Sequence, residues 1–299
     1  MRVLILGKGY VGTALAECLN NVYNVTHVSK RELDYTDRSK LFMFIVKQRD
    51  PFVFVINTCG YTGRPNVDAC EDNIEDTWYY NVTVPVNIQK TCKDAGVRLI
   101  HISSGCIFDG YHKRFTEEDE PNFGLLNPSS SWYSKTKHAC EMTLKDRDLY
   151  IFRIRMPFCS TWSERNIITK LLKYDNIIDQ ENSLTSLEDM CGFIMYFLAD
   201  ILDADKRHAY GIYNVVNPQP VKTSDIISIL KQHDLQNHRW KTITLDELYK
   251  TTKTGRSNCV LSDAKITDLD LRLPDTIKSL NFSIQRMKDT MDISSELEN

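Results

Sequence analysis

The sequence predicts an α/β fold in which helices cover both faces of a doubly wound parallel sheet, with a smaller C-terminal α/β domain beside it. Three observations predict this class. The chain opens on a short apolar segment followed at once by a glycine-rich turn, strand-length apolar runs alternate with helical patterns, and the turns between them are short. A chain of 299 residues is long enough to bury a large core. The pattern changes near residue 157, so we place an approximate domain boundary there, between 1–157 and 158–299, and expect some of the chain to cross back.

The first strand, residues 3–6, leads into Gly-Lys-Gly-Tyr-Val-Gly at 7–12, and apolar residues then recur at helical spacing. In this context the glycines let the backbone approach a pyrophosphate, while free N–H groups at the helix N-terminus face it. The pattern predicts a dinucleotide-binding domain of the Rossmann type. We expect its cofactor to be held by Gly7, Gly9, Tyr10, Val11 and Gly12.

The second strand, residues 24–28, is followed by Ser29, Lys30 and Arg31. Folds of this kind that prefer NAD usually carry an acid near this strand end, where it binds the ribose hydroxyls. A hydroxyl and two cations instead suit the extra phosphate of NADPH. We therefore predict NADPH as the cofactor, with NADH less favoured; the alternative is that these residues form only a solvated basic turn.

The alternation continues through the first half of the chain. A strand over 52–56 runs into Asn57, Cys59 and Gly60, whose size allows close approach of a cofactor. The pattern then predicts a long helix over 68–93, a strand ending at Ser104, a helix carrying Tyr133, and a strand over 149–153.

The second half has fewer strand signals. The pattern predicts helices over 166–174, 187–201 and 223–233, short strands at 213–216 and near 243, and a loosely ordered polar tail over 292–299.

Tyr133 and Lys137 are four residues apart, so both side chains lie on one face of the predicted helix. A nearby ammonium favours phenolate over phenol, so Lys137 is expected to lower the pKa of Tyr133. The Ser104 hydroxyl, at a strand end, could hydrogen-bond the same carbonyl oxygen as Tyr133. Together the three could polarise a ketone and protonate the alkoxide that hydride transfer leaves. The alternative is an exposed helix with a half-buried tyrosine.

Composition excludes several other classes of protein. The net charge of −3 and the lack of a polybasic run indicate no nucleic-acid partner. No apolar stretch approaches the ~20 residues that span a bilayer, and no cleavable signal is seen, so we expect a cytoplasmic protein without a membrane partner. The nine cysteines and seven histidines show no metal-ligand spacing. We expect no metal and buried free thiols rather than disulfides. Oligomeric state is open, and a homodimer is possible.

From residue 57 onward the chain resembles one family closely: the bifunctional UDP-4-keto-6-deoxy-D-glucose 3,5-epimerase/4-reductases of UDP-L-rhamnose synthesis. They belong to the extended short-chain dehydrogenase/reductase superfamily and are related to dTDP-4-dehydrorhamnose reductase. The glycine turn is one residue shorter than is usual there and is similar to that of UDP-glucose 6-dehydrogenases, and Ser104 stands for a common threonine. The matching stretches are Gly-Arg-Pro-Asn-Val-Asp at 63–68, Gly-Cys-Ile-Phe at 105–108, Glu-Glu-Asp-Glu-Pro-Asn-Phe at 117–123, Tyr-Ser-Lys-Thr-Lys at 133–137, Arg-Ile-Arg-Met-Pro at 153–157, Asn-Ile-Ile-Thr-Lys at 166–170 and Arg-Ser-Asn at 256–258.

The resemblance implies an oxidoreductase and isomerase whose substrate is a UDP-sugar. It implies an NADP-binding domain over 1–157 and a nucleotide-sugar-binding domain over 158–299. Cys106 and Lys170 would carry the 3,5-epimerisation, before NADPH-dependent reduction at carbon 4 by Ser104, Tyr133 and Lys137. Candidates for substrate binding are Arg64 and Arg256 for the pyrophosphate and Asn66, Asn122 and Asn166 for sugar or uracil.

Several alternatives stay open at this point. Cys106 taken alone could be a small buried hydrophobe, and Lys170 a solvated helix residue. The chain could be a reductase only, acting on a dTDP- or UDP-linked 4-dehydrorhamnose, or a non-catalytic NADP-binding regulatory subunit. Which of Cys106 and Lys170 is the base, and whether the nucleotide is UDP or dTDP, is also open.

Overall fold

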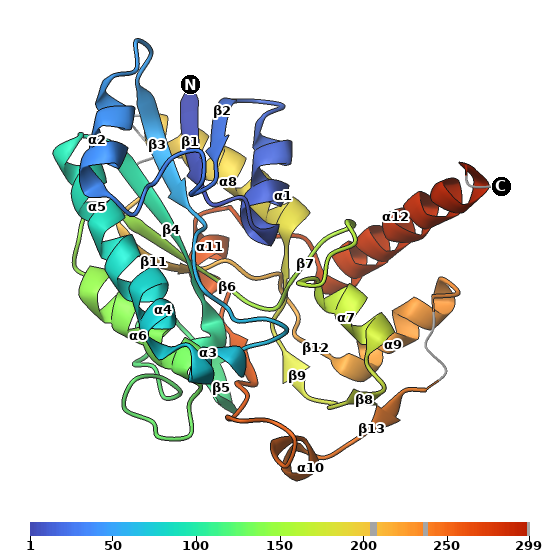
Figure 1. The fold of residues 1–299 in the computed structure, drawn as a ribbon. Helices are drawn as coiled ribbons and strands as arrows, with labels where there is room; N and C mark the ends of the chain where they lie inside the picture. The colour runs from blue at the N-terminus through green and yellow to red at the C-terminus, as the bar shows by residue number, and fades with distance from the viewer. Residues whose placement is uncertain (204–207, 236–238, 298–299) are drawn as a thin grey trace.

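The structure, a computed structural model, describes residues 1–203, 208–235 and 239–297. Its centre is a six-stranded sheet in the order β11-β6-β4-β3-β1-β2, in which every neighbouring pair is parallel (Figure 1). This confirms the predicted doubly wound α/β class. The strands are β1 Arg2–Leu6, β2 Asn24–Val28, β3 Phe52–Asn57, β4 Arg98–Ser104, β6 Tyr150–Ile154 and β11 Gly211–Asn214.

Helices bury both faces of this sheet because alternate strand residues point to opposite sides. Val3 and Ile5 of β1 belong to one core, with α1 Tyr10–Leu19 and α8 Leu187–Leu202. Leu4 and Leu6 belong to the other core. That second core is covered by α2 Arg38–Val46, α5 Val84–Asp94 and α6 Trp132–Leu144.

The prediction of one continuous helix over 68–93 is wrong. It is divided into α3 Ala69–Asp72, α4 Ile74–Trp78, a π-helical turn η1 Tyr79–Thr83, and α5. Asn73 leaves helical geometry with φ −127° and ψ 56°, which separates α3 from α4. The wide turn places Asn81 inside the protein, where it bonds neighbouring segments; π-helical turns are common at such functional positions.

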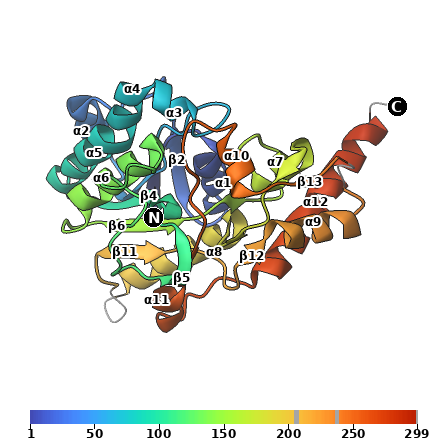
Figure 2. The ribbon, with the colours of Figure 1, turned by 90° about the horizontal axis from the view of Figure 1, so that it is seen from below.

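Three helices of the second half lie together beside the central sheet (Figures 1 and 2). α7 Ile167–Lys173, α9 Thr223–Gln232 and α12 Thr276–Leu297 share a separate hydrophobic core. The shorter elements are the 3-10 turn η2 Gly105–Ile107, β5 Gly110–Phe115 with β14 Cys259–Leu261, β7 Pro157–Phe158 with β10 Thr185–Ser186, β8 Asn176–Ile177 with β13 Lys241–Thr242, β9 Glu181–Asn182 with β12 Val221–Lys222, α10 Leu245–Tyr249 and α11 Ala264–Asp268.

The chain crosses back after residue 157. α8 and β11 come from the second half, yet they cover and extend the central sheet. Because these elements pack with the first half, the division at residue 157 into a cofactor-binding part and a sugar-binding part stays a prediction. The expected loose tail is wrong over its first part, because α12 continues through Leu297; residues 298 and 299 lie outside the described residues.

The expectation that all cysteines are free thiols is wrong for one pair. Cys18 of α1 and Cys191 of α8 form a disulfide, because these two helices pack side by side on the same face and bring the two Cα atoms to 6.4 Å. The other seven cysteines are free.

A buried ion pair ties α6 to the sheet. Arg153 of β6 donates from Nε and Nη2 to Glu141 Oε2 at 3.0 and 2.8 Å, and Ser103 of β4 donates to Glu141 Oε1 at 2.5 Å. Both charged side chains are almost fully buried. Removing one partner would leave the other charge buried and unpaired.

We predict that Glu141→Gln lowers the free energy of unfolding by about 3–5 kcal/mol, because the Arg153 guanidinium loses its counter-charge. Urea denaturation would measure this. Asp94→Asn is the matched control, since it breaks the exposed Arg38–Asp94 pair and should lose less than about 1 kcal/mol. Equal losses in the two variants would contradict the role given to the buried pair.

Candidate active site

The predicted site residues gather where the parallel strands end. Gly7 follows β1, Asn57 ends β3 and Ser104 ends β4, so all three lie at the carboxyl edge of the sheet. The strand order reverses at β1, which has β2 on one side and β3 on the other. Ligands of open α/β sheets bind in the crevice at such a switch point.

The glycine turn is packed against the residues after β3. Thr58 donates from Oγ1 to the carbonyls of Leu6 and Gly7 at 2.9 and 3.0 Å. A Cβ on Gly12 would lie 2.0 Å from the Gly7 oxygen, whereas a Cβ on Gly9 would meet nothing within 4 Å. α1 begins after Gly9 with no side-chain cap. The turn therefore has an open position beside N–H groups that suit a phosphate.

Two predicted cofactor residues of α1 lie partly exposed next to this turn. Tyr10 donates its hydroxyl to Cys159 Sγ at 3.3 Å, and burial raises the pKa of Tyr10 far above its usual value. Val11 packs against the α1–α8 core.

The turn after β2 differs from the sequence prediction in one respect. An acid is present, because Glu32 accepts from Ser29 N at 2.7 Å and Ser29 Oγ at 2.8 Å, and pairs with Lys8 Nζ at 2.6 Å. These contacts with Lys8 and Ser29 lower the pKa of Glu32 to about 2. Lys30 donates to the Tyr80 hydroxyl at 2.6 Å, and the Arg31 side chain is exposed. Two cations therefore remain beside an ion-paired acid.

The end of β3 is a buried polar cluster. Asn57 Oδ1 accepts from Cys59 N at 3.1 Å and Cys59 Sγ at 2.6 Å, and its Nδ2 contacts His101 Nδ1 at 3.0 Å. Burial, with the Lys137 charge, lowers the pKa of His101 well below its usual value. Gly60 leaves little room next to Asn81, since a Cβ would lie 3.1 Å from Asn81 Oδ1. These contacts fix the backbone next to the glycine turn.

Ser104 and Tyr133 are brought together as predicted. Tyr133, in the first turn of α6, is hydrogen-bonded to the Ser104 side chain. Lys137 is 5% exposed and donates to the Ile102 carbonyl of β4 at 3.3 Å. The predicted fall in the pKa of Tyr133 is wrong here: burial raises it, Cys106 adds to the rise, and Ser104 opposes it. Tyr133 is thus held as a neutral phenol, which can donate a proton.

Cys106 lies two residues beyond Ser104 in η2, and its backbone N–H donates to Ser104 Oγ at 3.2 Å. Its thiol is partly exposed and accepts from Arg155 Nη1 at 3.0 Å. Lys170 of α7 is half-buried near Cys106; burial and Arg165 lower the pKa of Lys170, while Cys106 raises it. Cys106 is therefore not a fully buried hydrophobic residue, and Lys170 is not a fully solvated helix residue.

The residues predicted to bind substrate differ from one another in exposure and in contacts. Arg64 is exposed, whereas Arg256 pairs with Asp68 at 2.8 Å. The three asparagines already use their amides locally: Asn66 accepts from Asp68 N, Asn122 bonds both backbone polar groups of Asp109, and Asn166 caps α7 with no exposed surface. These contacts give the asparagines a structural role, and their binding of substrate stays a prediction.

Three further residues of the site were not singled out from the sequence. Arg155 contacts Cys106, as described above. Arg165 donates from Nη2 to the Gly63 carbonyl at 2.6 Å, and its charge acts on both Tyr133 and Lys170. Asn81 donates to the Tyr61 carbonyl and to Thr136 Oγ1, which ties the residues after β3 to α6. Arg155 and Arg165 lie inside or next to the matching stretches, which was the available signal.

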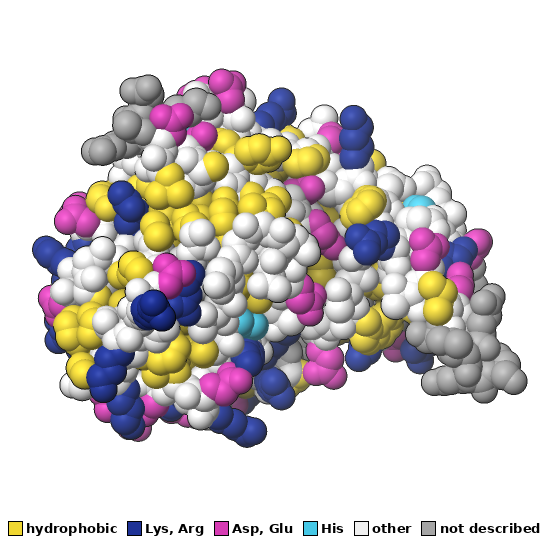
Figure 3. All heavy atoms as spheres, turned by 90° about the horizontal axis from the view of Figure 1, so that it is seen from above, with side chains coloured by type: hydrophobic (Ala, Val, Ile, Leu, Met, Phe, Trp, Pro, Cys, Tyr) yellow, Lys and Arg dark blue, Asp and Glu magenta, His cyan; other side chains and the backbone are white. Residues whose placement is uncertain are grey.

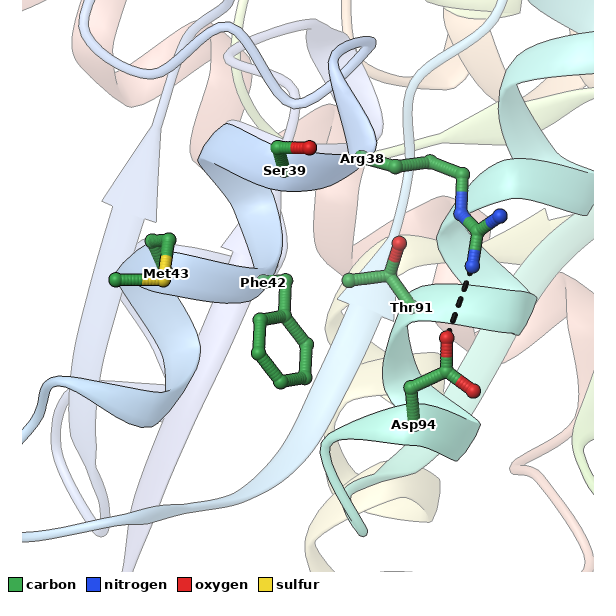
Figure 4. A pocket seen from close by; sticks show the side chains of 6 residues that line it. All are labelled: Arg38, Ser39, Phe42, Met43, Thr91 and Asp94. Atoms are coloured by element: carbon green, nitrogen blue, oxygen red, sulfur yellow. Dashed lines mark hydrogen bonds and ion pairs between the residues drawn. The ribbon is translucent and has the colours of Figure 1, made fainter.

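Other surface features lie away from this site. A hollow of about 430 Å³ between α2 and α5 is crossed by the Arg38–Asp94 ion pair, and none of the predicted site residues lines it (Figure 4). On the face drawn in Figure 3, cationic and anionic side chains are interspersed around hydrophobic areas. Within the described ranges, no helix has the length and apolarity to cross a bilayer, and no cluster of three or more His, Cys, Asp or Glu side chains could hold a metal.

Comparison with known proteins assigns the family. The RmlD substrate binding domain family matches residues 1–288, and the chain belongs to this family. It is similar to a bifunctional dTDP-4-dehydrorhamnose 3,5-epimerase/dTDP-4-dehydrorhamnose reductase of Arabidopsis thaliana, with 34% identity over 274 residues, covering 88% of this chain and 85% of the relative.

A trifunctional Arabidopsis thaliana protein, a UDP-glucose 4,6-dehydratase/UDP-4-keto-6-deoxy-D-glucose 3,5-epimerase/UDP-4-keto-L-rhamnose-reductase, is 32% identical over 276 residues. The match covers 89% of this chain but only 39% of that protein, so the chain spans about two fifths of its length. Among solved structures, the UDP-rhamnose synthase of Acanthamoeba polyphaga mimivirus has a TM-score of 0.84 at 26% identity, covering 96% of this chain and 99% of the other.

We predict that Gly12→Ala lowers the free energy of unfolding by about 1–3 kcal/mol, because its Cβ has no room beside the Gly7 carbonyl. Gly9→Ala, whose Cβ enters open space, should change it by less than about 0.5 kcal/mol. Chemical denaturation of both variants without ligand measures the difference. A harmless Gly12→Ala would mean that the turn is not packed as described.

Proposed function

We propose that this protein converts UDP-4-keto-6-deoxy-D-glucose to UDP-L-rhamnose, by inverting carbons 3 and 5 and then reducing the carbon 4 ketone. The observation that carries the proposal is the meeting of Ser104, Tyr133 and Cys106 at one strand end, with Lys137 and Lys170 beside them. The names of the Arabidopsis and mimivirus relatives support the same chemistry.

The residues at the switch point fit a dinucleotide. The open position at Gly9 and the uncapped N-terminus of α1 would hold the pyrophosphate. Lys30 and Arg31 would face the ribose phosphate that distinguishes NADPH from NADH. Asn57, Cys59 and Gly60 would line the path toward Tyr133, and Lys137 would bind the nicotinamide ribose. NADPH bound there would supply the hydride.

The reduction uses Tyr133 as the acid. Its phenol carries a proton at neutral pH, as tyrosine ordinarily does, and burial raises its pKa further. It can therefore donate that proton to the oxygen on carbon 4, while Ser104 hydrogen-bonds the same oxygen. Lys137, one helical turn after Tyr133, donates to the Ile102 carbonyl of β4, and its positive charge would help to stabilise the negative charge that develops on the oxygen.

The epimerisation uses Cys106 and Lys170. A ketone at carbon 4 acidifies the protons on carbons 3 and 5, so inversion needs a base on one face and an acid on the other. A cationic Lys170 could also stabilise the enolate. A reductase-only function is the second candidate, and it would leave the half-exposed Cys106 and half-buried Lys170 without a chemical role. A regulatory subunit would need none of the five residues.

We predict that Tyr133→Phe abolishes reduction but leaves solvent deuterium exchange at carbons 3 and 5, because only the proton-donating hydroxyl is lost.

We predict that Cys106→Ser stops solvent deuterium exchange at carbons 3 and 5, since a serine hydroxyl is far less acidic than a thiol. This variant should still reduce a 4-keto sugar that is already epimerised. Mass spectrometry of the recovered sugar in D₂O reads exchange, and NADPH absorbance reads reduction.

The exposed tyrosine Tyr196 offers a matched control, and Tyr196→Phe should change neither activity. Normal exchange in Cys106→Ser would leave a reductase only. Reduction at the wild-type rate in Tyr133→Phe would remove the tyrosine from the mechanism.

We also predict that Arg31→Ala weakens NADPH binding by about 1–3 kcal/mol, the size of a charge-assisted contact, and leaves NADH binding nearly unchanged. Isothermal titration of both cofactors measures this without catalysis. Equal weakening of the two would place Arg31 away from the 2′-phosphate.

A further inference from the structure

The first turn of α6, which carries Tyr133, is capped by a side chain from a distant part of the chain. The first N–H groups of a helix have no partner within that helix. Ser131, just before α6, accepts with its hydroxyl from Ser134 N at 3.1 Å. The backbone N–H of Trp132 donates instead to Glu71 Oε1 at 2.6 Å, and Glu71 belongs to α3. Because Tyr133 follows Trp132 directly, this bond holds the backbone from which the Tyr133 side chain extends.

Two further contacts from the same segment hold Trp132. Its indole Nε1 donates to the Ile74 carbonyl of α4 at 3.0 Å. Its ring centroid lies 6.1 Å from that of Trp78, also in α4. The segment of α3 and α4 therefore contacts the first residue of α6 through its backbone, its indole N–H and its ring.

Other hydrogen bonds from distant segments, apart from that between Ser104 and Tyr133, reach α6 further along, such as those at Thr136, Lys137 and Glu141. Helix ends fray, so contacts beyond the first turn leave that turn some freedom. A change there would move the Tyr133 hydroxyl relative to Ser104, to which it is bonded. A displacement of about 1 Å can slow a reaction about 100-fold.

The charges on α3 explain why Glu71 is available for this contact. The neighbouring acids pair with cations of the second half of the chain, Asp68 with Arg256 at 2.8 Å and Asp72 with Lys253 at 2.5 Å. Glu71 has no Lys, Arg or His nitrogen within 4.0 Å among the residues that the structure describes. Its charge lies instead at the N-terminus of α6, where a carboxylate is favourable.

We propose that Glu71 is a positioning residue for the carbon 4 reduction: it holds the first turn of α6 so that the Tyr133 hydroxyl meets Ser104 and the ketone oxygen. Glu71 acts through the backbone of Trp132 and transfers no proton itself. This inference rests on the reduction step of the proposed function and does not depend on the epimerisation. The capping itself can be measured without substrate.

Amide hydrogen exchange of the intact protein, read by mass spectrometry of the peptide spanning residues 130–136, measures the capping. Glu71→Ala should speed exchange in this peptide about tenfold or more, because the Trp132 N–H loses its acceptor. Glu71→Gln keeps an oxygen that can accept the same N–H and should change exchange less than about threefold. Asp72→Asn, the matched control on the same helix, breaks an exposed ion pair and should leave this peptide unchanged.

The reduction is read by NADPH absorbance with a 4-keto sugar that is already epimerised. Glu71→Ala should lower kcat about tenfold or more. Its KM for the sugar and its affinity for NADPH should stay within about twofold of the wild type. Glu71→Gln should restore most of kcat, and Asp72→Asn should retain it. A loss confined to kcat and rescued by glutamine separates positioning from general instability.

Full kcat in Glu71→Ala would overturn the proposal, as would unchanged exchange in the 130–136 peptide or an equal loss of kcat in Asp72→Asn. If Glu71→Ala does not fold, Glu71→Asp replaces it with the same expectations, because its carboxylate reaches less far by one methylene. A wild-type protein that binds NADPH but reduces no 4-keto sugar would refute the proposed function and the purpose given to Glu71. The exchange measurement would still decide whether Glu71 holds the turn.

Discussion

The buried ion pair between Glu141 and Arg153 determines how α6 lies on the sheet, and the active site depends on that placement. Ser103 joins the pair from β4, one residue before Ser104. The same contact therefore sets the end of β4 against the helix that carries Tyr133 and Lys137. Charge and geometry leave little freedom here, because a shifted helix would leave two charges buried and unpaired.

Two buried arginines near the end of β6, Arg153 and Arg155, make different kinds of contact. Arg153 binds a carboxylate and fixes the fold, whereas Arg155 contacts a thiol and reaches Asn182 and Ser257 in the second half of the chain. Arg155 thus joins segments far apart in sequence around Cys106. The central sheet likewise includes β11 and is covered by α8, both from the second half of the chain.

The sequence predicted the parts of the molecule that follow local rules. Apolar periodicity placed β1 to β4 and β6 within about a residue, and the glycine turn lies between a strand and a helix as predicted. Long-range contacts were not predictable in the same way. The break at Asn73, the ion pair that brings Glu32 to the end of β2, and the Cys18–Cys191 disulfide all depend on partners that only the fold brings together. The burial that raises the pKa of Tyr133 is of the same kind.

The proposed function requires one site both to invert and to reduce the sugar. Its most direct test is to incubate the wild-type protein with UDP-4-keto-6-deoxy-D-glucose and NADPH in D₂O, and to identify the product by NMR. We expect UDP-L-rhamnose with deuterium at carbons 3 and 5. A product reduced at carbon 4, with its original configuration and protium at carbons 3 and 5, would contradict the account.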